Sequence, residues 1–160
     1  MTPAHRSASV LSLHATAVVI GEAGLLIRGS SGAGKSSLAF ALIAAAGGAG
    51  FFARLVGDDR VEIEARSGRL IARGHPAILG QIERRGQGIF EMAALPAAIV
   101  RMVILLAGAA ETAARYPEPD GLSTTLAGVK LPLMTLRQDA APASAACAVL
   151  ADLRLRHILI

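Results

Sequence analysis

The sequence has no tryptophan, a single cysteine and few aromatic residues, and each scarcity excludes a class of protein. Because Cys147 stands alone, the chain cannot form an internal disulfide, which fits a reducing cytosol. Aromatic residues make up 3% of the chain, so few side chains can stack on nucleic-acid bases. The basic residues are scattered arginines without a run, and the net charge is +4. We therefore expect a cytoplasmic protein that suits anionic ligands and binds no nucleic acid.

The sequence also lacks the patterns that are typical of targeting and membrane segments. The first 15 residues do not have the charged-then-apolar order of a secretory signal. The most apolar stretch, residues 93–110, is interrupted by Pro96 and Arg101, so it fits a buried core segment better than a membrane span. We predict that no membrane is involved.

What the sequence does contain is enough apolar material for one domain. Its 160 residues are the usual size of a domain, and 53% of them are hydrophobic. The core must be built from Ala, Leu, Ile and Val, which suits Ala-rich helices packed on a sheet. We expect one domain over residues 1–160, with residues 1–12 as a flexible N-terminus.

The order of the local patterns predicts an α/β fold. A pattern typical of a hairpin turns at Ser67-Gly68, so the central sheet should be mixed and not purely parallel. A short helix and a glycine-bounded loop are expected over residues 75–88, and a loop over residues 116–123. The expected strands span residues 13–20, 25–28, 51–59, 61–66, 69–73, 88–92, 100–108 and 127–136, and the expected helices span residues 36–48 and 142–159.

A phosphate-binding loop is the strongest motif. Residues 29–36 match G-x-x-x-x-G-K-[ST], with an apolar strand before the loop and an Ala/Leu helix after it. Glycines let several main-chain N–H groups point at one anion, and the helix adds its positive end. Lys35 would hold the β- and γ-phosphates, and Ser36 would bind Mg²⁺. The alternative is a Gly/Ser-rich turn that matches by chance. The expected nucleotide-binding residues are Gly29, Ser30, Ser31, Gly32, Ala33, Gly34, Lys35, Ser36 and Ser37.

Two further sets of residues can act beside this loop. Asp58 and Asp59 end a predicted strand, where one acid can hold Mg²⁺ and the other can accept a proton from an attacking hydroxyl. In the segment after residue 81, Glu83 can bind Mg²⁺ and Arg85 can clamp phosphoryl oxygens. The alternatives are a solvated turn for the two aspartates and a charged helix end for the later segment. His14, upstream of the loop, can contact phosphate or be a satisfied core residue.

Three blocks in this order resemble the catalytic C-terminal domain of HPr kinase/phosphorylase. They are LHATAVVIGEAGLLIRGSSGAGKSS, RLVGDDRVEI and IERRGQGIFEM, which together span residues 13–92. The resemblance implies a nucleotide-binding core like that of HPr kinase and phosphoenolpyruvate carboxykinase. It also implies ATP and Mg²⁺ as cofactors, the phosphocarrier protein HPr as the substrate, and a homo-oligomer, since the family is often hexameric.

The resemblance also assigns roles to residues. Asp59 would deprotonate the target serine, His14 would lie near the transferred phosphate, and Lys35 would hold the nucleotide. Ser36 and Glu83 would hold Mg²⁺. Arg85 would belong to the catalytic signature segment, and Arg115 would correspond to a later catalytic arginine.

The chain departs from the family pattern at several places. Arg84 replaces the usual Ile, Glu91 replaces Asp or Asn, and the Leu-Gly pair expected after Arg115 is missing. The family's N-terminal domain is not seen, its C-terminal helices look truncated, and LRQDAAPAS stands near the place of its PVRPGRN stretch. These departures favour kinase activity over the reverse phosphorylase activity. A phosphate-loop kinase for a small metabolite and a non-catalytic ATP-sensing module remain as alternatives.

Overall fold

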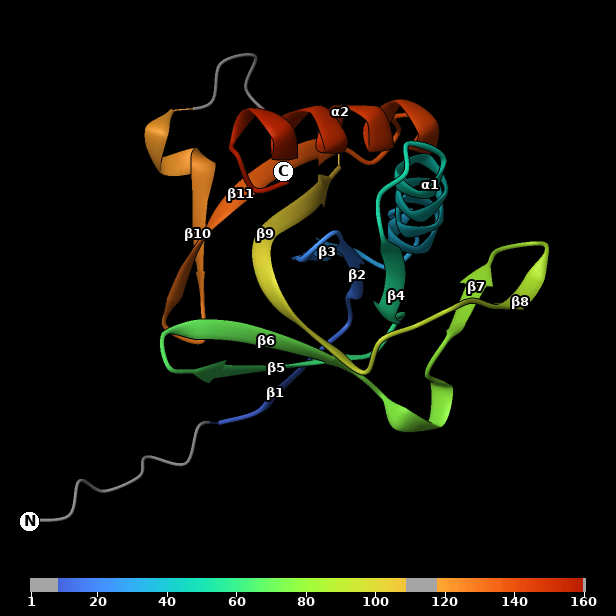
Figure 1. Ribbon diagram of the computed structural model, residues 1–160, viewed down its shortest axis with the longest axis horizontal. Coiled ribbons are helices and arrows are strands. Elements are labelled where there is room, and N and C mark those ends of the chain that lie inside the picture. Colours follow the sequence, from blue (N-terminus) through green and yellow to red (C-terminus); the bar gives the residue numbers. More distant parts are fainter. Residues whose placement is uncertain (1–8, 109–117, 160) are drawn as a thin grey trace, which may run out of the picture.

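Nine strands form one mixed sheet in the computed structural model, which describes residues 9–108 and 118–159 (Figure 1). The strand order is β1-β5-β6-β9-β3-β2-β4, with β11 also paired to β9 and β10 paired to β11. The strands are β1 (Leu11–Leu13), β2 (Thr16–Ile20), β3 (Ala23–Gly29), β4 (Ala53–Gly57), β5 (Val61–Arg66), β6 (Arg69–Gly74), β7 (Gln81–Arg84), β8 (Gly88–Glu91), β9 (Ala97–Ala107), β10 (Ser123–Leu126) and β11 (Val129–Arg137). The helices are α1 (Lys35–Gly48) and α2 (Pro142–Leu155), with short 3-10 turns η1 (Pro76–Ile78) and η3 (Pro119–Leu122).

The pairing confirms the expected mixed α/β fold. β9 is parallel to β3 and β11, whereas the other ladders are antiparallel. The predicted hairpin is β5–β6, and both turn residues, Ser67 and Gly68, have positive φ angles of 50° and 74°. Two positive φ angles are typical of a type I′ turn, which suits the twist of paired strands.

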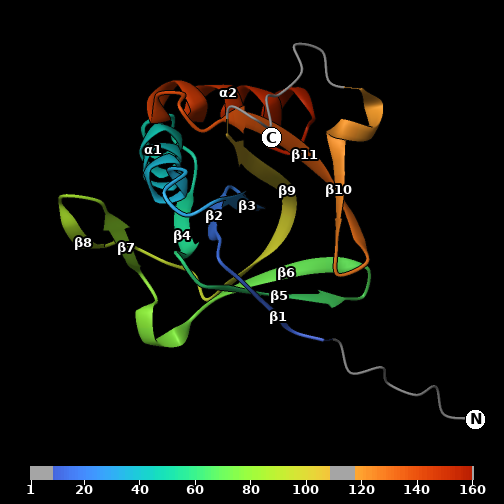
Figure 2. The same ribbon diagram turned by 180° about the vertical axis from the view of Figure 1, so that it is seen from behind.

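Two apolar clusters hold the elements together. The first lies between α1, α2 and one face of the sheet, and includes Leu38, Leu42, Val149 and Ile104. The second lies on the other face, where β5, β6 and the start of β9 fold across β2 and β3, and includes Val61. Figures 1 and 2 show both helices on the same side of the sheet, away from β5 and β6. The alternating side chains of β2, β3 and β9 can therefore be buried on both faces.

Three sequence-based expectations about the elements were wrong. The strand expected over residues 13–20 breaks at His14-Ala15, because β1 pairs with β5 while β2 pairs with β3 and β4. The segment expected to be a short helix and a loop forms the strand β7 after η1, because Ile82 packs into the core and its neighbours face outward. The closing helix ends at Leu155, not 159, because His157 turns the chain with φ 55° and buries Leu159.

The most apolar stretch of the sequence forms a strand of the sheet. Residues 97–107 are β9, which pairs with β3 on one side and with β6 and β11 elsewhere along its length. In the ranges that the structure describes, none of the helices is long and apolar enough to cross a membrane.

Candidate active site

The Gly-rich loop joins the end of β3 to the start of α1, as its sequence pattern predicts. Gly32 and Gly34 have φ angles of 78° and 94°, which L-residues with a side chain rarely adopt. α1 begins without a side-chain cap and has no acidic residue in its first turn. The first main-chain N–H groups of the helix are therefore available to an anion.

Lys35 is the first residue of α1 and is almost fully buried. Its Nζ donates hydrogen bonds to the carbonyl oxygens of Gly29 (3.1 Å) and Ser30 (2.9 Å), so the ammonium lies inside the loop. Burial lowers the pKa of Lys35 below its ordinary value, and the nearby Asp59 and Asp58 carboxylates oppose this effect. The positive charge of Lys35 is thus held inside the Gly-rich loop, where it loses part of its solvation.

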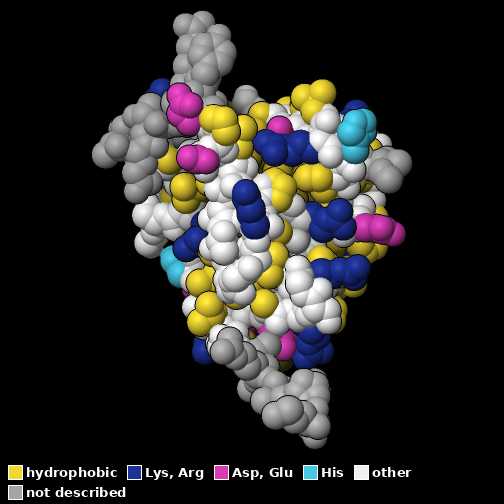
Figure 3. All heavy atoms as spheres, turned by 90° about the vertical axis from the view of Figure 1, so that its left-hand side faces the viewer, with side chains coloured by type: hydrophobic (Ala, Val, Ile, Leu, Met, Phe, Trp, Pro, Cys, Tyr) yellow, Lys and Arg dark blue, Asp and Glu magenta, His cyan; other side chains and the backbone are white. Residues whose placement is uncertain are grey.

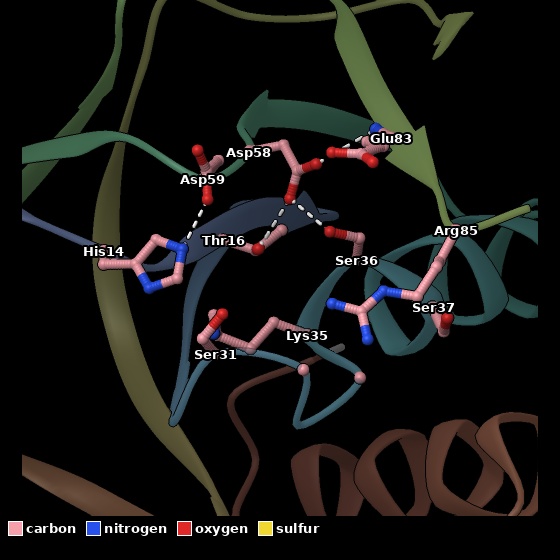
Figure 4. A pocket seen from close by; sticks show the side chains of 12 residues that line it. His14, Thr16, Ser31, Lys35, Ser36, Ser37, Asp58, Asp59, Glu83 and Arg85 are labelled. Atoms are coloured by element: carbon pink, nitrogen blue, oxygen red, sulfur yellow. Dashed lines mark hydrogen bonds and ion pairs between the residues drawn. The ribbon is translucent and has the colours of Figure 1, made fainter. Parts of the chain in front are cut away.

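Asp58 follows β4 and is 5% exposed. Its Oδ1 accepts hydrogen bonds from the hydroxyls of Ser36 and Thr16, both at 2.7 Å. Its Oδ2 accepts a bond of 3.2 Å from the main-chain N–H of Glu83 (Figure 4). This one carboxylate therefore ties together β2, α1, β4 and β7.

Thr16 was not predicted from the sequence to belong to the site. It is fully buried in β2, and its hydroxyl faces Asp58. The one available signal is that Thr16 is the sole polar residue among the five of that strand, whose sequence is TAVVI. A buried hydroxyl needs a hydrogen-bond partner, although the sequence does not say which one.

Asp59 lies beside Asp58 but points to a different partner. Its φ of 64° is in the left-handed region, which Asp tolerates better than most residues. This backbone turn aims its carboxylate at His14, whose Nε2 contacts Asp59 Oδ1 (Figure 4). Both side chains are solvent-exposed, at 49% for His14 and 75% for Asp59. The pair therefore stands at the open edge of the site, where a second substrate can reach it.

The β7–β8 hairpin brings Glu83 and Arg85 to the opposite side of the same cleft. The guanidinium of Arg85 lies next to Gly32 of the phosphate loop. Arg84, which stands between Glu83 and Arg85 in the sequence, faces away from the cleft. Its guanidinium lies 4.3 Å from the ring centre of Phe40 on α1. The hairpin is thus attached to the helix that carries the phosphate loop.

The cleft enclosed by these residues has a volume of about 280 Å³. A second hollow, of about 430 Å³, adjoins it and shares His14. Of the predicted site residues, the cleft brings together His14, Ser31, Gly32, Gly34, Lys35, Ser36, Ser37, Asp58, Asp59, Glu83 and Arg85. Gly29 and Ser30 line the second hollow. Ala33 is buried and lines neither space, and Arg115 lies outside the described residues.

The donor set fits Mg²⁺ bound jointly with a phosphate ligand. The Ser36 hydroxyl and Asp58 Oδ1 are 2.7 Å apart, and Glu83 adds a second carboxylate to the cleft. Within the described ranges, no three His, Cys, Asp or Glu side chains are grouped to hold a metal by themselves. This is typical of Mg²⁺, which commonly takes one or two carboxylates and completes its shell with water and phosphate oxygens.

The loop geometry also fits the phosphates of a nucleotide. A Cβ placed on Gly34 would meet no atom within 4 Å, so the space above the loop is open. Cations from Lys35 and Arg85 approach that space from two sides. This combination of main-chain N–H groups, a helix start and two cations suits a polyphosphate.

Comparison with known proteins points to one family. Residues 5–108 match the family model described as the HPr serine kinase C-terminal domain. The chain is 39% identical over 79 residues to the HPr kinase/phosphorylase of Mycoplasma mycoides, an alignment covering 49% of this chain and 23% of that protein. It is 41% identical over 83 residues to the HPr kinase/phosphorylase of Clostridium perfringens, covering 52% and 25%. The matched region is thus about a quarter of the length of these relatives.

A solved structure shares the fold. The Hpr(Ser) kinase/phosphatase from Coxiella burnetii superposes with a TM-score of 0.75, covering 93% of this chain and 99% of that one at 24% identity.

Proposed function

Because the chain belongs to the HPr serine kinase C-terminal domain family, we propose that it is an ATP-dependent kinase for a serine of the phosphocarrier protein HPr. One observation carries the proposal. The Asp58–Asp59 pair and the phosphate loop face the same cleft, although 22 residues separate Ser36 from Asp58. Nucleotide binding needs no exposed carboxylate beside the loop, whereas an exposed carboxylate in this position can accept the proton of an attacking hydroxyl.

The triphosphate of ATP is bound by the loop in this proposal. The main-chain N–H groups at the start of α1 and the Lys35 ammonium hold the phosphates, and Arg85 contacts them from the hairpin. Mg²⁺ would be held by Ser36, Asp58 and Glu83, and when bound it neutralises negative charge on the phosphate oxygens. The binding residues come from elements fixed by the core, so the reacting groups are positioned before the chemistry begins.

The acceptor serine enters from the open side, next to Asp59. Its hydroxyl oxygen forms a bond to the γ-phosphorus while the bond from that phosphorus to the β-γ bridging oxygen breaks. The hydroxyl proton passes to the Asp59 carboxylate, and ADP leaves with the electron pair of the broken bond. His14 orients Asp59, while Lys35 and Arg85 stabilise charge on the transferring group.

The deciding experiment is to incubate the protein with ATP, Mg²⁺ and HPr from the same organism, and to detect phosphoserine by mass spectrometry. We expect one phosphate on one serine of HPr, and none with the Lys35→Met variant. Phosphorylation of a compound in a metabolite panel, with HPr unmodified, would indicate a small-metabolite kinase instead. ATP binding without transfer to either class would indicate an ATP-sensing module.

A further inference from the structure

Another cleft, separate from the active-site cleft and its adjoining hollow, lies at the opposite end of the sheet from the phosphate loop. It has a volume of about 660 Å³ and is lined by residues from β6, β9 and β11, together with Glu22, Gly68 and Ile158. Glu22 directly precedes β3, whereas the phosphate loop follows the last residue of β3. The seven residues of β3 separate the two sites by roughly 20 Å. We refer to this space as the distal cleft.

The distal cleft exists because two strands paired to β9 separate from each other. The β6–β9 ladder begins at Ile71, and the β11–β9 ladder begins at Leu133. Arg69–Leu70 and Val129–Pro132 therefore lie beyond the ends of the ladders with β9, next to the β9 residues 100–102, although β5 and β10 pair with them on their other edges. Figures 1 and 2 show the β5–β6 and β10–β11 turns side by side there. In the described residues, no ladder covers the edges of β6 and β11 that face this notch, so polar main-chain groups on those edges can accept and donate hydrogen bonds to a ligand.

The rim of the distal cleft is positively charged. Arg69, Arg101 and Lys130 come from three different strands, are exposed, and line the same space. Glu22 is its one acidic lining residue. Within the part of the chain that the structure describes, none of the three cations is in an ion pair. Figure 3 shows Lys and Arg side chains among hydrophobic ones over the centre of this side of the molecule, with Asp and Glu toward the rim.

The floor of the distal cleft is apolar. Leu70, Val100 and Leu131 are buried in the second core cluster and form its base. A concave, mostly preformed space of this volume, with an apolar floor and a few convergent polar groups, is typical of a small-molecule site. Because the cleft has three cationic side chains and one acidic side chain, it favours a ligand that carries more than one negative charge.

We propose that the distal cleft binds a small organic anion that carries at least two negative charges. Its charged groups contact Arg69, Arg101 and Lys130, and its carbon skeleton lies on the apolar floor. The occupant bridges β6 and β11, which do not pair with each other. This site is separate from the phosphate loop and does not depend on the kinase function proposed above.

The test is a titration of nitrogen-15-labelled protein with citrate, followed by two-dimensional NMR. The phosphate loop is first saturated with Mg²⁺ and a non-hydrolysable ATP analogue, and the concentration of free Mg²⁺ is held constant because citrate chelates this ion. Citrate then neither occupies the loop nor removes its metal. We expect the amide signals of residues 99–101 and 129–131 to shift with a saturable curve. Arg101→Gln should weaken citrate binding roughly tenfold, as loss of a charge-assisted hydrogen bond does.

Arg66→Gln is the matched control. Arg66 pairs directly with Arg69 across the hairpin turn but does not line the cleft, and its loss changes the net charge equally. Citrate affinity should stay within twofold in this variant. Equal weakening in both variants, or no saturable shift with citrate, would overturn the proposal. So would a Glu-rich peptide that shifts the same amides at lower concentration than citrate, because the cleft would then be a protein-docking surface.

Discussion

The Ser36 hydroxyl donates a hydrogen bond of 2.7 Å to Asp58 Oδ1, and this contact joins the phosphate loop's helix to the end of β4. Thr16 donates to the same oxygen from β2. Because Asp58 is only 5% exposed, water compensates poorly for a partner that is removed. The floor of the active-site cleft therefore depends on a few contacts among residues far apart in sequence.

Thr16→Val tests this dependence. Valine has nearly the same shape but no hydroxyl, so Asp58 loses one of its three donors. We expect the free energy of unfolding to fall by about 2 kcal/mol, the usual cost of removing a hydrogen bond to a buried charged group. Urea denaturation measures the change. Thr125→Val, at an exposed position in β10, is the control and should stay within about 0.5 kcal/mol of the wild type. Equal stability of the two variants would mean that the Thr16 contact contributes nothing.

Lys35→Met should separate the stability role of this lysine from its role in transfer. Burial lowers the pKa of Lys35 below 10.5, so the unfolded chain binds the proton more tightly than the folded protein does. The penalty for burying the charged form is complete at neutral pH and disappears as pH rises toward 10.5. Wild-type stability should therefore increase relative to Lys35→Met over the alkaline range just below 10.5, as measured by denaturation at several pH values. Parallel pH profiles would contradict this.

Transfer activity should respond differently to the same substitution. The ammonium of Lys35 lies against the carbonyl oxygens of the Gly-rich loop, and methionine keeps the length of the side chain without its charge. We expect phosphoryl transfer to fall by at least about 100-fold, as is usual when a charge-stabilising donor is removed. A folded Lys35→Met variant with unchanged turnover would remove Lys35 from the proposed mechanism.

Asp59→Asn should abolish proton transfer and leave nucleotide binding intact. The side chain is exposed and bonds to His14, not to the phosphate loop. Loss of a general base commonly lowers turnover by 10²- to 10⁴-fold, at about constant ligand affinity. Turnover with HPr and the Kd of an ATP analogue are the two measurements. Near-normal turnover of this variant would contradict a base role for Asp59.

His14→Ala should lower turnover more than it lowers nucleotide affinity. His14 acts through Asp59 in this mechanism, so the double variant with Asp59→Asn should be no slower than Asp59→Asn alone. Multiplicative losses would indicate that His14 has an independent role.

Arg84→Ala tests the attachment of the β7–β8 hairpin. Arg84 stacks on Phe40 of α1 and so attaches β7 to the helix. β7 carries Glu83 and leads directly into Arg85, so this contact helps to position both residues. We expect a loss of about 0.5–1 kcal/mol, faster amide exchange in β7 and β8, and a severalfold decrease in turnover. Arg54→Ala is the matched control, because Arg54 stacks on Phe52 at 4.5 Å without lining the active-site cleft. If both variants lose turnover equally, the Arg84 contact has no special role in the site.

The conformation of the proposed site was predictable from sequence where it depends on neighbouring residues. The phosphate loop is a contiguous stretch whose glycines, lysine and flanking elements all fall within about 25 residues, so its conformation follows from short-range preferences. The mixed sheet was also predictable, because a Ser-Gly turn between two alternating segments specifies a hairpin. The role of Arg115 stays a prediction.

Other features were hidden because they depend on contacts between distant segments. β7 is only four residues long, and its alternation is too short to distinguish from a charged helix end until Ile82 is seen in the core. The partnership of Thr16 with Asp58 spans 42 residues. The distal cleft depends on where two ladders end along β9, which no local pattern records.

The amino-acid sequence by itself thus determined the fold class, the place of the Gly-rich loop between a strand and a helix, and the residue types available for phosphoryl transfer, because these follow from local backbone preference and side-chain chemistry. Tertiary structure alone decided which carboxylate is buried among hydroxyls and which is exposed beside His14. Two adjacent aspartates have the same intrinsic chemistry, and only the packing of β2, α1 and β7 around one of them gives them different environments.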